Sequence, residues 1–405
     1  MAPVAGSAGI LEGLRVIDLG HALAAPFAAT MLADHGADVL KIEHPERGDP
    51  MRRLGPRKRD MPVWWKAAGR NKRSVTLDFR SGRGREILLR LVERSDVLVE
   101  NFRPGTLERH GLGWDDLRAA NPRLVMLRIS GFGQDGPYAE RPGFGRVAEA
   151  MSGAAALTGE ADGPPMHVGY SLADTLSGLM GAFGVLLALQ GRDRTGDGEC
   201  VDLALYEPLF RLIDWQVVVY DQLGIAGTRA GNAFPVVLEG VAAGVARTVD
   251  GAWLSYSAAT DSVLERLVRL LVAEGRVPAG SYTTPEGRRR GSGEIQEIVT
   301  AWIGTKTVAE VERLFAERQA VIGRVYGVEE IWSDPGYRAR GNLVTVDDAE
   351  AGPVTMHGVV PRLARRPGCV RWAGPPLGAH TEEVLVDLAG VRPEELPALR
   401  REGVI

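Results

Sequence analysis

The sequence predicts an α/β protein with a large domain, built on a mostly parallel, doubly wound sheet, and a smaller α+β domain. Strand and helix signals alternate over roughly the first 200 residues, as they do where helices connect parallel strands. A hairpin signal and amphipathic helices follow, which is typical of a separate α+β unit. A length of 405 residues is enough for about two to three domains.

The first unit of the large domain is a strand, a helix and a second strand over residues 14–43. LRVIDLG predicts the first strand, AAPFAATMLADHG a helix rich in small residues, and ADVLKIE the second strand. The alternation continues through SVTLDF, GRGREILLRLVERS, DVLVEN, WDDLRAAN and LVMLRIS. Ligands of such sheets bind at the carboxyl ends of the strands, so we expect the functional residues there.

The rest of the chain predicts a linker, a small domain and a returning segment. VDLALYEPLFRLIDWQVVVYDQL predicts a strand that runs into a long helix leaving the domain. Asp250-Gly251 favours a type I′ hairpin turn, and helices are expected to begin at the capping boxes Ser262–Glu265 and Thr307–Glu310. LVTVDD with VTMHGVV predicts a second hairpin, and TEEVLVDLAG a terminal helix. The expected boundaries are 10–200 for the large domain, 201–235 for the linker helix, 236–340 for the small domain, 341–375 for a return linker and 376–405 for a carboxyl-terminal segment.

Composition and charge indicate a cytoplasmic protein without a chain-wide polyanion partner. The 48 basic and 52 acidic residues give a net charge of -4, so we expect binding to neither nucleic acid nor membrane. Cys200 and Cys369 form no disulfide framework and no zinc spacing. The amino terminus lacks the features of a signal peptide, and the apolar run Gly178–Leu189 is shorter than the roughly 20 residues that a membrane span requires.

Gly131-Phe132-Gly133-Gln134-Asp135-Gly136 matches the GxGxxG pattern of dinucleotide-binding proteins and follows a predicted strand. Prolines follow it at positions 137 and 142, so no helix N-terminus is available for a pyrophosphate. We therefore interpret these glycines as a turn or as backbone that approaches a ligand. Walker A, HExxH and GxSxG sequences are absent, and the seven histidines lack metal-ligand spacing, so we expect no metal.

The segment from Arg52 to Arg73 carries nine basic residues against the single acid Asp60. One interpretation is a solvated loop or a nucleic-acid patch; another is the entrance to a site for a polyanionic small ligand, since guanidinium and ammonium groups both suit phosphate. Trp64 and Trp65 lie within it and either stack on a base or anchor the loop on the core.

Ser171-Leu172-Ala173-Asp174 precedes an apolar helix and fits a capping box, with Asp174 in the first turn. By itself this spacing is structural, since helix caps far outnumber catalytic carboxylates. The position also suits a nucleophile, because the positive end of a helix favours the ionised form of a carboxylate that burial would protonate.

Several phrases together resemble the family III CoA-transferases, which include formyl-CoA transferase, the carnitine CoA-transferases and, as a racemising branch, α-methylacyl-CoA racemase. The resemblance spans nearly the whole chain and is specific when its parts are taken jointly. It rests on LEGLRVIDLGHALAAPFAATMLADHGADVLKIEHPERGDPMR, NKRSVTLDF, SDVLVENFRPGTLERHGLG, ISGFGQDGP, SLADTLSGLMGA and PLGAHTEEVL.

The resemblance implies an interlocked homodimer of two ring-like subunits, each with a Rossmann-like, CoA-binding large domain that the carboxyl-terminal segment rejoins. It implies that Asp174 is the nucleophile, which passes through a mixed anhydride and an aspartyl-CoA thioester. The substrates would be an acyl-CoA and a small carboxylic acid, with no permanently bound cofactor. Backbone amides near Gly131, Gly133 and Gly136 are candidates to stabilise the developing negative oxygen.

The resemblance also assigns contacts to CoA. His21 and Ala24 fall beside the pantetheine and thiol end. The positions that fall where family members contact the adenine and the phosphates are His44, Leu77, Arg80 and Arg109. His44 stands where formyl-CoA transferase has an arginine, which weakens its role with phosphate at neutral pH.

Departures from the family's patterns separate the alternatives. Racemases have His-Asp where this chain has Phe144-Gly145, so the second base is missing and racemisation is the second hypothesis. Leu23 replaces a Gln of formyl-CoA transferase, and the glycine-rich loop of that enzyme's small domain is missing, which favours a less polar acid than oxalate or formate. A catalytically idle CoA-binding or scaffold protein, and a nucleic-acid binder that uses the basic segment, are the remaining alternatives.

Overall fold

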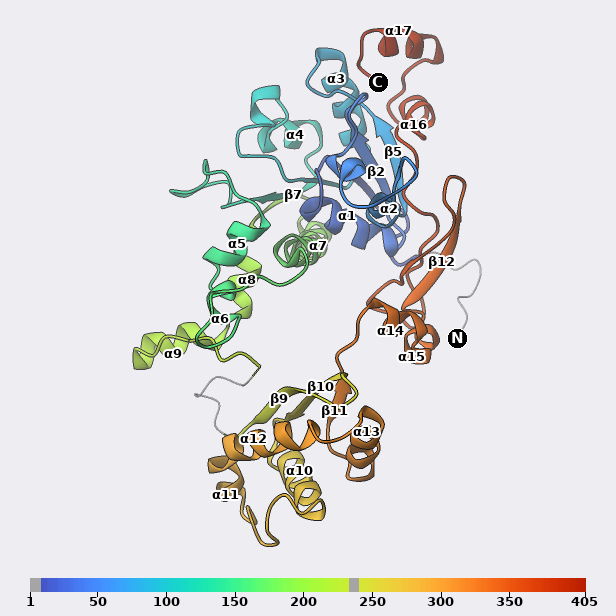
Figure 1. Cartoon of the computed structure of the whole chain (residues 1–405). Helices are drawn as coiled ribbons and strands as arrows, with labels where there is room; N and C mark the ends of the chain where they lie inside the picture. Colours follow the sequence, from blue (N-terminus) through green and yellow to red (C-terminus); the bar gives the residue numbers. More distant parts are fainter. Residues whose placement is uncertain (1–8, 233–239) are drawn as a thin grey trace. The chain divides into compact units, whose positions relative to one another are not determined.

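The computed structural model describes residues 9–232 and 240–405. The chain forms two compact units (Figure 1). The large unit contains the described residues up to Gly153, together with Val168–Ile213 and Pro335–Ile405. The small unit contains Ala154–His167 and the described part of Asp214–Asp334.

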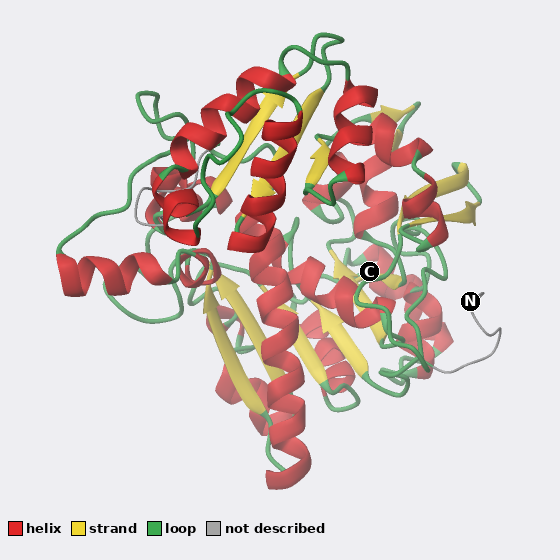
Figure 2. Cartoon of the chain, turned by 90° about the horizontal axis from the view of Figure 1, so that it is seen from below, coloured by secondary structure: helices red, strands yellow, loops and turns green. Residues whose placement is uncertain are grey.

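The large unit contains a six-stranded sheet whose strands are all parallel, seen among the yellow strands of Figure 2. Its order is β5-β2-β1-β6-β7-β8, so the chain starts near the centre and winds outward on both sides. The predicted parallel, doubly wound sheet is therefore confirmed. The strands are β1 Arg15–Asp18, β2 Asp38–Glu43, β5 Lys72–Thr76, β6 Val97–Glu100, β7 Val125–Ser130 and β8 Glu199–Ala204.

The central strands are apolar runs that are buried on both faces, as parallel sheets require. Helices α1 (Ala24–Asp34), α3 (Gly82–Val92) and α4 (Trp114–Ala120) follow successive strands and supply the crossovers. The helices α16 (Thr381–Asp387) and α17 (Leu396–Arg401) place their apolar residues in the same core cluster as the sheet. Residues about 300 positions apart in sequence therefore share one hydrophobic core.

Helix α7 (Leu172–Thr195) packs closely on α1 because two glycines face the large unit's interior. A Cβ on Gly178 would lie 2.6 Å from the carbonyl oxygen of Ala24, and one on Gly181 would lie 2.8 Å from the side chain of Leu127. The helix has 24 residues, so the expectation that its apolar run is too short for a membrane span is wrong in length. By length and composition alone α7 could cross a bilayer, with 39% of its apolar window buried.

The predicted long helix after β8 is two helices, α8 (Glu207–Leu212) and α9 (Trp215–Leu223). The break falls at Asp214, whose φ of 40° is incompatible with a continuous right-handed helix. This part of the linker prediction is therefore wrong.

The small unit contains a three-stranded antiparallel sheet, β11-β10-β9, which is covered by amphipathic helices around its own core. The predicted hairpin is confirmed, but the turn is not type I′, because only Gly251, and not Asp250, has a positive φ. The elements are β9 Ala242–Arg247, β10 Trp253–Ala258, β11 Ile322–Arg324, α6 Ala154–Leu157, α10 Asp261–Ala273, α11 Pro285–Arg290, α12 Ser292–Ile303, α13 Val308–Glu317 and α14 Val328–Ser333.

The two predicted capping boxes of the small unit have different outcomes. Thr307–Glu310 is confirmed, since each residue's side chain accepts a hydrogen bond from the other's backbone amide. Ser262–Glu265 is wrong: α10 begins at Asp261, Thr260 is its N-cap, and no side chain caps it.

The second predicted hairpin, β12 (Leu343–Asp348) with β13 (Gly352–His357), is confirmed and belongs to the large unit. Its tip is held by Lys66 on α2 (Val63–Ala68), whose Nζ lies 2.9 Å from Asp348 and 2.7 Å from Glu350. The remaining elements are β3 Arg57–Lys58, β4 Met61–Pro62, α5 Gly145–Met151, α15 Pro335–Ala339 and the 3-10 turns Pro50–Arg53, Glu108–His110 and Pro393–Glu395.

A buried ion network lies at the end of β1. Asp18 is fully buried, and its carboxylate lies 2.8 Å from Lys72 Nζ and 3.5 Å from Lys41 Nζ. Lys41 also lies 2.8 Å from Asp49. These four charges are each at most 2% exposed, so each depends on the others for its solvation.

We predict that Lys72→Met lowers the free energy of unfolding by about 3–5 kcal/mol, because it leaves the buried carboxylate of Asp18 partly uncompensated. Urea unfolding followed by circular dichroism measures the effect. Arg269→Met, which breaks an exposed pair with Glu265, is the control and should cost about 1 kcal/mol or less. Equal losses in the two variants would contradict a special role for the buried network.

Candidate functional site

The loops at the carboxyl ends of the parallel strands carry most of the residues that the sequence singled out. His21 follows β1, His44 follows β2, and Arg80 follows β5. Arg109 follows β6, and the glycine motif follows β7. Because all six strands are parallel, these loops lie on one edge of the sheet, as expected for a ligand site.

The turn after β1 is held in a strained conformation. Ala22 has a φ of 57°, which a non-glycine residue rarely adopts. The Asn101 side chain accepts from the His21 amide at 2.7 Å and donates to the His21 carbonyl at 2.9 Å. The carboxylate of Asp49 accepts from the Ala22 amide at 3.0 Å. Several bonds therefore fix the conformation of this turn.

The ion network acts directly on this turn. Burial alone would raise the pKa of Asp49, but the charge of Lys41 and its hydrogen bond, together with the hydrogen bond from the Met51 amide, outweigh burial and lower the pKa below its ordinary value. Asp49 is thus an anion that accepts hydrogen bonds from the backbone. The pKa of His21 is lowered, first by desolvation and then by the charge of Lys41, so its imidazole is neutral at neutral pH.

The predicted CoA contacts differ in how much of each side chain is free. Arg80 forms a bidentate pair with Asp78 at 2.7 and 2.8 Å but stays nearly half exposed. Arg109 is exposed and donates to Thr106 at 3.2 Å. The His44 ring accepts from the amides of its own turn. These contacts remain predictions.

Two further CoA-contact predictions concern buried residues. Leu77 is 1% exposed and packs in the core, so only its backbone is available to a ligand. Ala24 is also buried, at the start of α1. Aromatic rings near this edge contact one another. The ring centroids of His21 and Phe102 lie 4.8 Å apart, and those of Phe79 and Phe102 lie 5.9 Å apart.

Asp174 lies in the first turn of α7, partly buried against α5. A Cβ on Gly145 would lie 2.6 Å from Asp174 Oδ2, so only glycine leaves room for this carboxylate. A Cβ on Gly131 would lie 3.1 Å from Gly143 Cα, which brings the glycine motif next to the same loop. The predicted capping box is wrong, since the Ser171 side chain makes no capping bond.

The electrostatics of Asp174 also correct the sequence-based expectation. Its pKa is raised, first by burial and second by the negative charge of Glu149, while its own backbone amide acts in the opposite direction. The N-terminal position on α7 was expected to favour the ionised form, but burial and the charge of Glu149 outweigh this effect. A carboxylate of raised pKa is more basic, and therefore a stronger nucleophile once ionised.

The glycine motif forms an irregular loop, and no helix begins before Gly145. Gly133 and Gly136 have positive φ values of 89° and 82°. Asp202 holds the loop by accepting from the Gln134 amide at 2.9 Å. Within residues 9–232 and 240–405, the amides of Gly133 and Gly136 donate to no protein acceptor; Gly133 is buried and Gly136 is exposed.

The basic segment is mostly a structural feature. Five of its nine basic side chains pair with carboxylates: Arg52 with Glu43, Lys66 with Asp348 and Glu350, Arg70 with Asp34, Lys72 with Asp18, and Arg73 with Asp38. Trp65 is buried under Arg52, whereas Trp64 is exposed. The four exposed cations are Arg53, Arg57, Lys58 and Arg59.

Sequence reasoning missed Arg146 and Glu149 on α5. Glu149 is 3% exposed, and its charge raises the pKa of Asp174. Arg146 Nη1 lies 3.3 Å from Glu149 Oε2. The available signal was the pair of opposite charges three residues apart, just after Phe144-Gly145.

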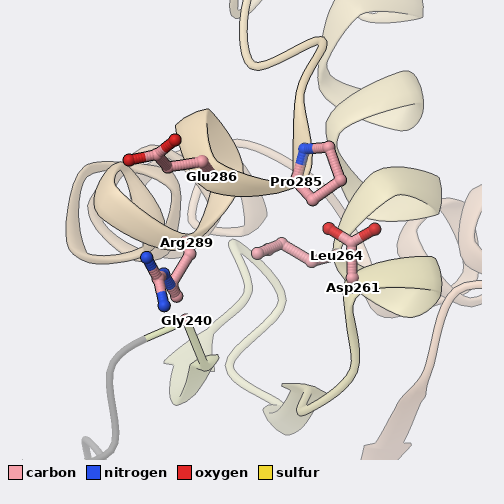
Figure 3. Close-up of a pocket in the computed structure, with 6 residues that line it drawn as sticks. All are labelled: Gly240, Asp261, Leu264, Pro285, Glu286 and Arg289. Carbon is pink, nitrogen blue, oxygen red and sulfur yellow. The ribbon is translucent and has the colours of Figure 1, made fainter.

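Two pockets of about 350 and 360 Å³ lie in the small unit, and Figure 3 shows the first, between α10 and α11.

Comparison with known proteins decides the family. The sequence profile described as CoA-transferase family III matches residues 11–381. The chain belongs to this family. It is 43% identical to the succinyl-CoA–L-malate CoA-transferase beta subunit and 39% identical to succinyl-CoA–D-citramalate CoA-transferase, both from Chloroflexus aurantiacus. Each alignment covers 98% of both chains.

A solved structure agrees with the family assignment. The crystal structure of a CAIB/BAIF family protein from Brucella suis superposes with a TM-score of 0.81, at 30% identity over 94% of this chain and all of the other. The family resemblance inferred from the sequence is therefore confirmed. The protein is a family III CoA-transferase, an enzyme that acts on CoA thioesters and carboxylic acids.

We predict that Asp174→Asn stabilises this CoA-transferase at neutral pH. The raised pKa means that ionising Asp174 costs stability, and this loss grows as pH rises from the unfolded pKa, about 3.9, through the folded one. The gain from Asn should therefore be present above the folded pKa and absent below about pH 3.9. Thermal unfolding across pH measures it, with the exposed Asp162→Asn as control; a pH-independent difference would contradict the prediction.

Proposed function

We propose that the enzyme transfers CoA from an acyl-CoA donor to a carboxylic acid acceptor through covalent intermediates on Asp174. The observation that carries the proposal is the placement of Asp174: its carboxylate is partly desolvated and lies against Gly145, where the absence of a side chain leaves it free to react. The unbonded amides of the adjacent glycine loop are suited to stabilise the oxyanions that form.

The reaction has four acyl transfers. An Asp174 oxygen attacks the donor thioester carbon and the C–S bond breaks, which gives a mixed anhydride and CoA thiolate. The thiolate attacks the aspartyl carbon, releases the donor acid and forms the aspartyl-CoA thioester. The acceptor carboxylate then attacks this carbon and expels the thiolate. Finally the thiolate attacks the acceptor's acyl carbon, which forms the new acyl-CoA and frees the Asp174 carboxylate.

We propose that CoA lies along the carboxyl edge of the sheet. His21 and the start of α1 at Ala24 would flank the pantetheine and thiol, since the glycine contact between α7 and α1 brings Asp174 toward this turn. The adenine and phosphates would lie near His44, the Leu77 backbone, Arg80 and Arg109. Arg80 and Arg109 expose guanidinium groups, which suit phosphate.

For the acids, we propose succinyl-CoA as donor and a dicarboxylic acid as acceptor. Relatives named for succinyl-CoA with malate or citramalate are 39–43% identical over nearly the whole chain, and one named succinate–glutarate CoA-transferase is 33% identical. This proposal replaces the expectation of a less polar acid. It also disfavours racemisation, for which Phe144-Gly145 offers no His-Asp pair.

We predict that incubation with succinyl-CoA forms a covalent adduct on the peptide containing Asp174. Hydroxylamine or borohydride traps the activated carboxyl, and peptide mass spectrometry locates it. Asp174→Ala should lose the adduct and lower kcat by at least about a thousandfold, as loss of a nucleophile does.

Two outcomes would contradict the transferase chemistry. An adduct that persists in the Asp174→Ala variant would place the nucleophile elsewhere. Deuterium incorporation at the α-carbon of an acyl-CoA in heavy water, without any adduct, would support a racemase instead.

We also propose that the enzyme is a cytoplasmic homodimer in which the outer face of α7 is covered by the second copy. Leu179, Phe183, Leu186 and Leu187 lie at helical spacing and are each 43–57% exposed in the single chain. An apolar stripe of this kind on a helix indicates a protein interface. The free thiols Cys200 and Cys369 suit a reducing compartment.

We predict that Phe183→Asp shifts the protein from dimer to monomer, because it buries a charge in the proposed interface. Size-exclusion chromatography with light scattering measures the mass. Val249→Asp, at an exposed apolar position in the small unit, is the control and should remain dimeric. A wild-type monomer, or a dimer in both variants, would contradict the assignment of this face.

A further inference from the structure

Arg146 occupies a special position relative to the nucleophile. It is the residue after Gly145, whose Cα faces the Asp174 carboxylate, and it lies in the first turn of α5. Its side chain is 53% exposed, so it borders solvent-accessible space beside the partly buried Asp174. The residue is thus a cation next to the nucleophile, on an element that packs against α7.

One end of the guanidinium is held by the protein and the rest of it is free. Nη1 donates to the Val168 carbonyl at 2.7 Å and lies 3.3 Å from Glu149 Oε2. Among the residues that the structure describes, Nε and Nη2 donate to no protein acceptor. The two bonds made by Nη1 therefore orient the guanidinium group and leave Nε and Nη2 for a ligand.

Glu149 explains why the cation is needed at this place. It is almost fully buried, on the same face of α5 as Gly145, one turn later. Its negative charge acts on Asp174, so an acid with a second carboxylate would enter a region that already holds two anions. A cation with free donors beside these groups therefore favours binding of such an acid.

We propose that Arg146 binds the remote carboxylate of a dicarboxylic acid while the other carboxyl group reacts at Asp174. The planar fork of Arg146 suits a carboxylate, and its anchoring by Glu149 and Val168 sets the direction of approach. This inference rests on the proposed transferase function and deepens it, because it names the group that selects dicarboxylic over monocarboxylic acids of the same length.

Other charges near α7 do not compete for this role. Arg128 on β7 is held by Glu100 and Glu108, and Arg192 at the far end of α7 by Asp96. The acidic groups on the packed elements offer no site for a carboxylate. Asp34 on α1 is paired with Arg70, Asp202 on β8 and Glu207 on α8 accept from backbone amides, and Glu199 begins β8 at the opposite edge of the sheet. Arg211 on α8 has an interaction partner of its own.

The test compares succinate and butyrate as acceptors of CoA, which differ in the second carboxylate and match in carbon number. Steady-state kcat/KM is measured for the full-length enzyme and for Arg146→Met, with glutaryl-CoA as the common donor, so that transfer to either acceptor gives a new acyl-CoA. We expect the succinate-to-butyrate ratio to fall on the order of tenfold to a hundredfold, as loss of a charged hydrogen bond predicts. The loss should lie mainly in KM for succinate, with butyrate changed by about twofold or less.

Two matched variants separate recognition from folding. Arg146→Lys keeps the charge but not the fork and should recover part of the preference for succinate. Arg313→Met, which breaks an exposed helix pair in the small unit, should leave the ratio unchanged. Thermal unfolding of each variant shows whether the fold is retained.

The outcomes distinguish this inference from the proposed function. Equal losses for both acids in Arg146→Met, or an unchanged ratio, would overturn the role of Arg146 while the Asp174 adduct still forms. A wild-type enzyme that forms the adduct yet prefers butyrate would overturn it as well. If wild type forms no adduct with any donor, the transferase function fails, and this inference fails with it.

Discussion

The buried ion network of Asp18, Lys41, Asp49 and Lys72 is the constraint on which the geometry of the site depends. Two lysines from neighbouring strands converge on one carboxylate at the end of β1. Charges removed from water in this way are stable only when each keeps its partner, so the strands, the turn after β1 and the loop at Asp49 are specified together.

The network fixes the geometry of the candidate site because one of its members, Asp49, bonds to the backbone of the turn after β1. Asp49 accepts from Ala22, whose positive φ is a strain that only such over-determined surroundings maintain. Asn101 holds the same turn from β6. The start of α1 is therefore placed accurately, and α7, which packs on it through Gly178, carries Asp174 to a defined position. A change in the network would therefore reach Asp174 through α1 and α7.

The sequence predicted the parts of the structure that depend on local pattern. The central strands β6 and β7 are mostly apolar runs, and Thr307–Glu310 is a local cap, so both were found. Features that depend on tertiary contacts were not predicted. Lys66 meets its partners nearly 300 residues away, so the basic segment looked unpaired. The role of Asp174 is still a prediction from family resemblance, and Glu149 was missed because its effect appears only when α5 packs on α7.

Helix α7 meets three structural requirements that normally conflict. Its inner face needs glycines for close packing on α1, its first turn must keep a carboxylate partly desolvated, and its outer face is apolar. Glycine and a buried charge both weaken a helix, so the element cannot be stable by itself. The 24-residue length and the extensive contact with α1, β7 and β8 offset this cost. Asp174 is therefore held on a firmly packed helix, which suits a carboxylate whose position must be fixed for the proposed acyl transfer.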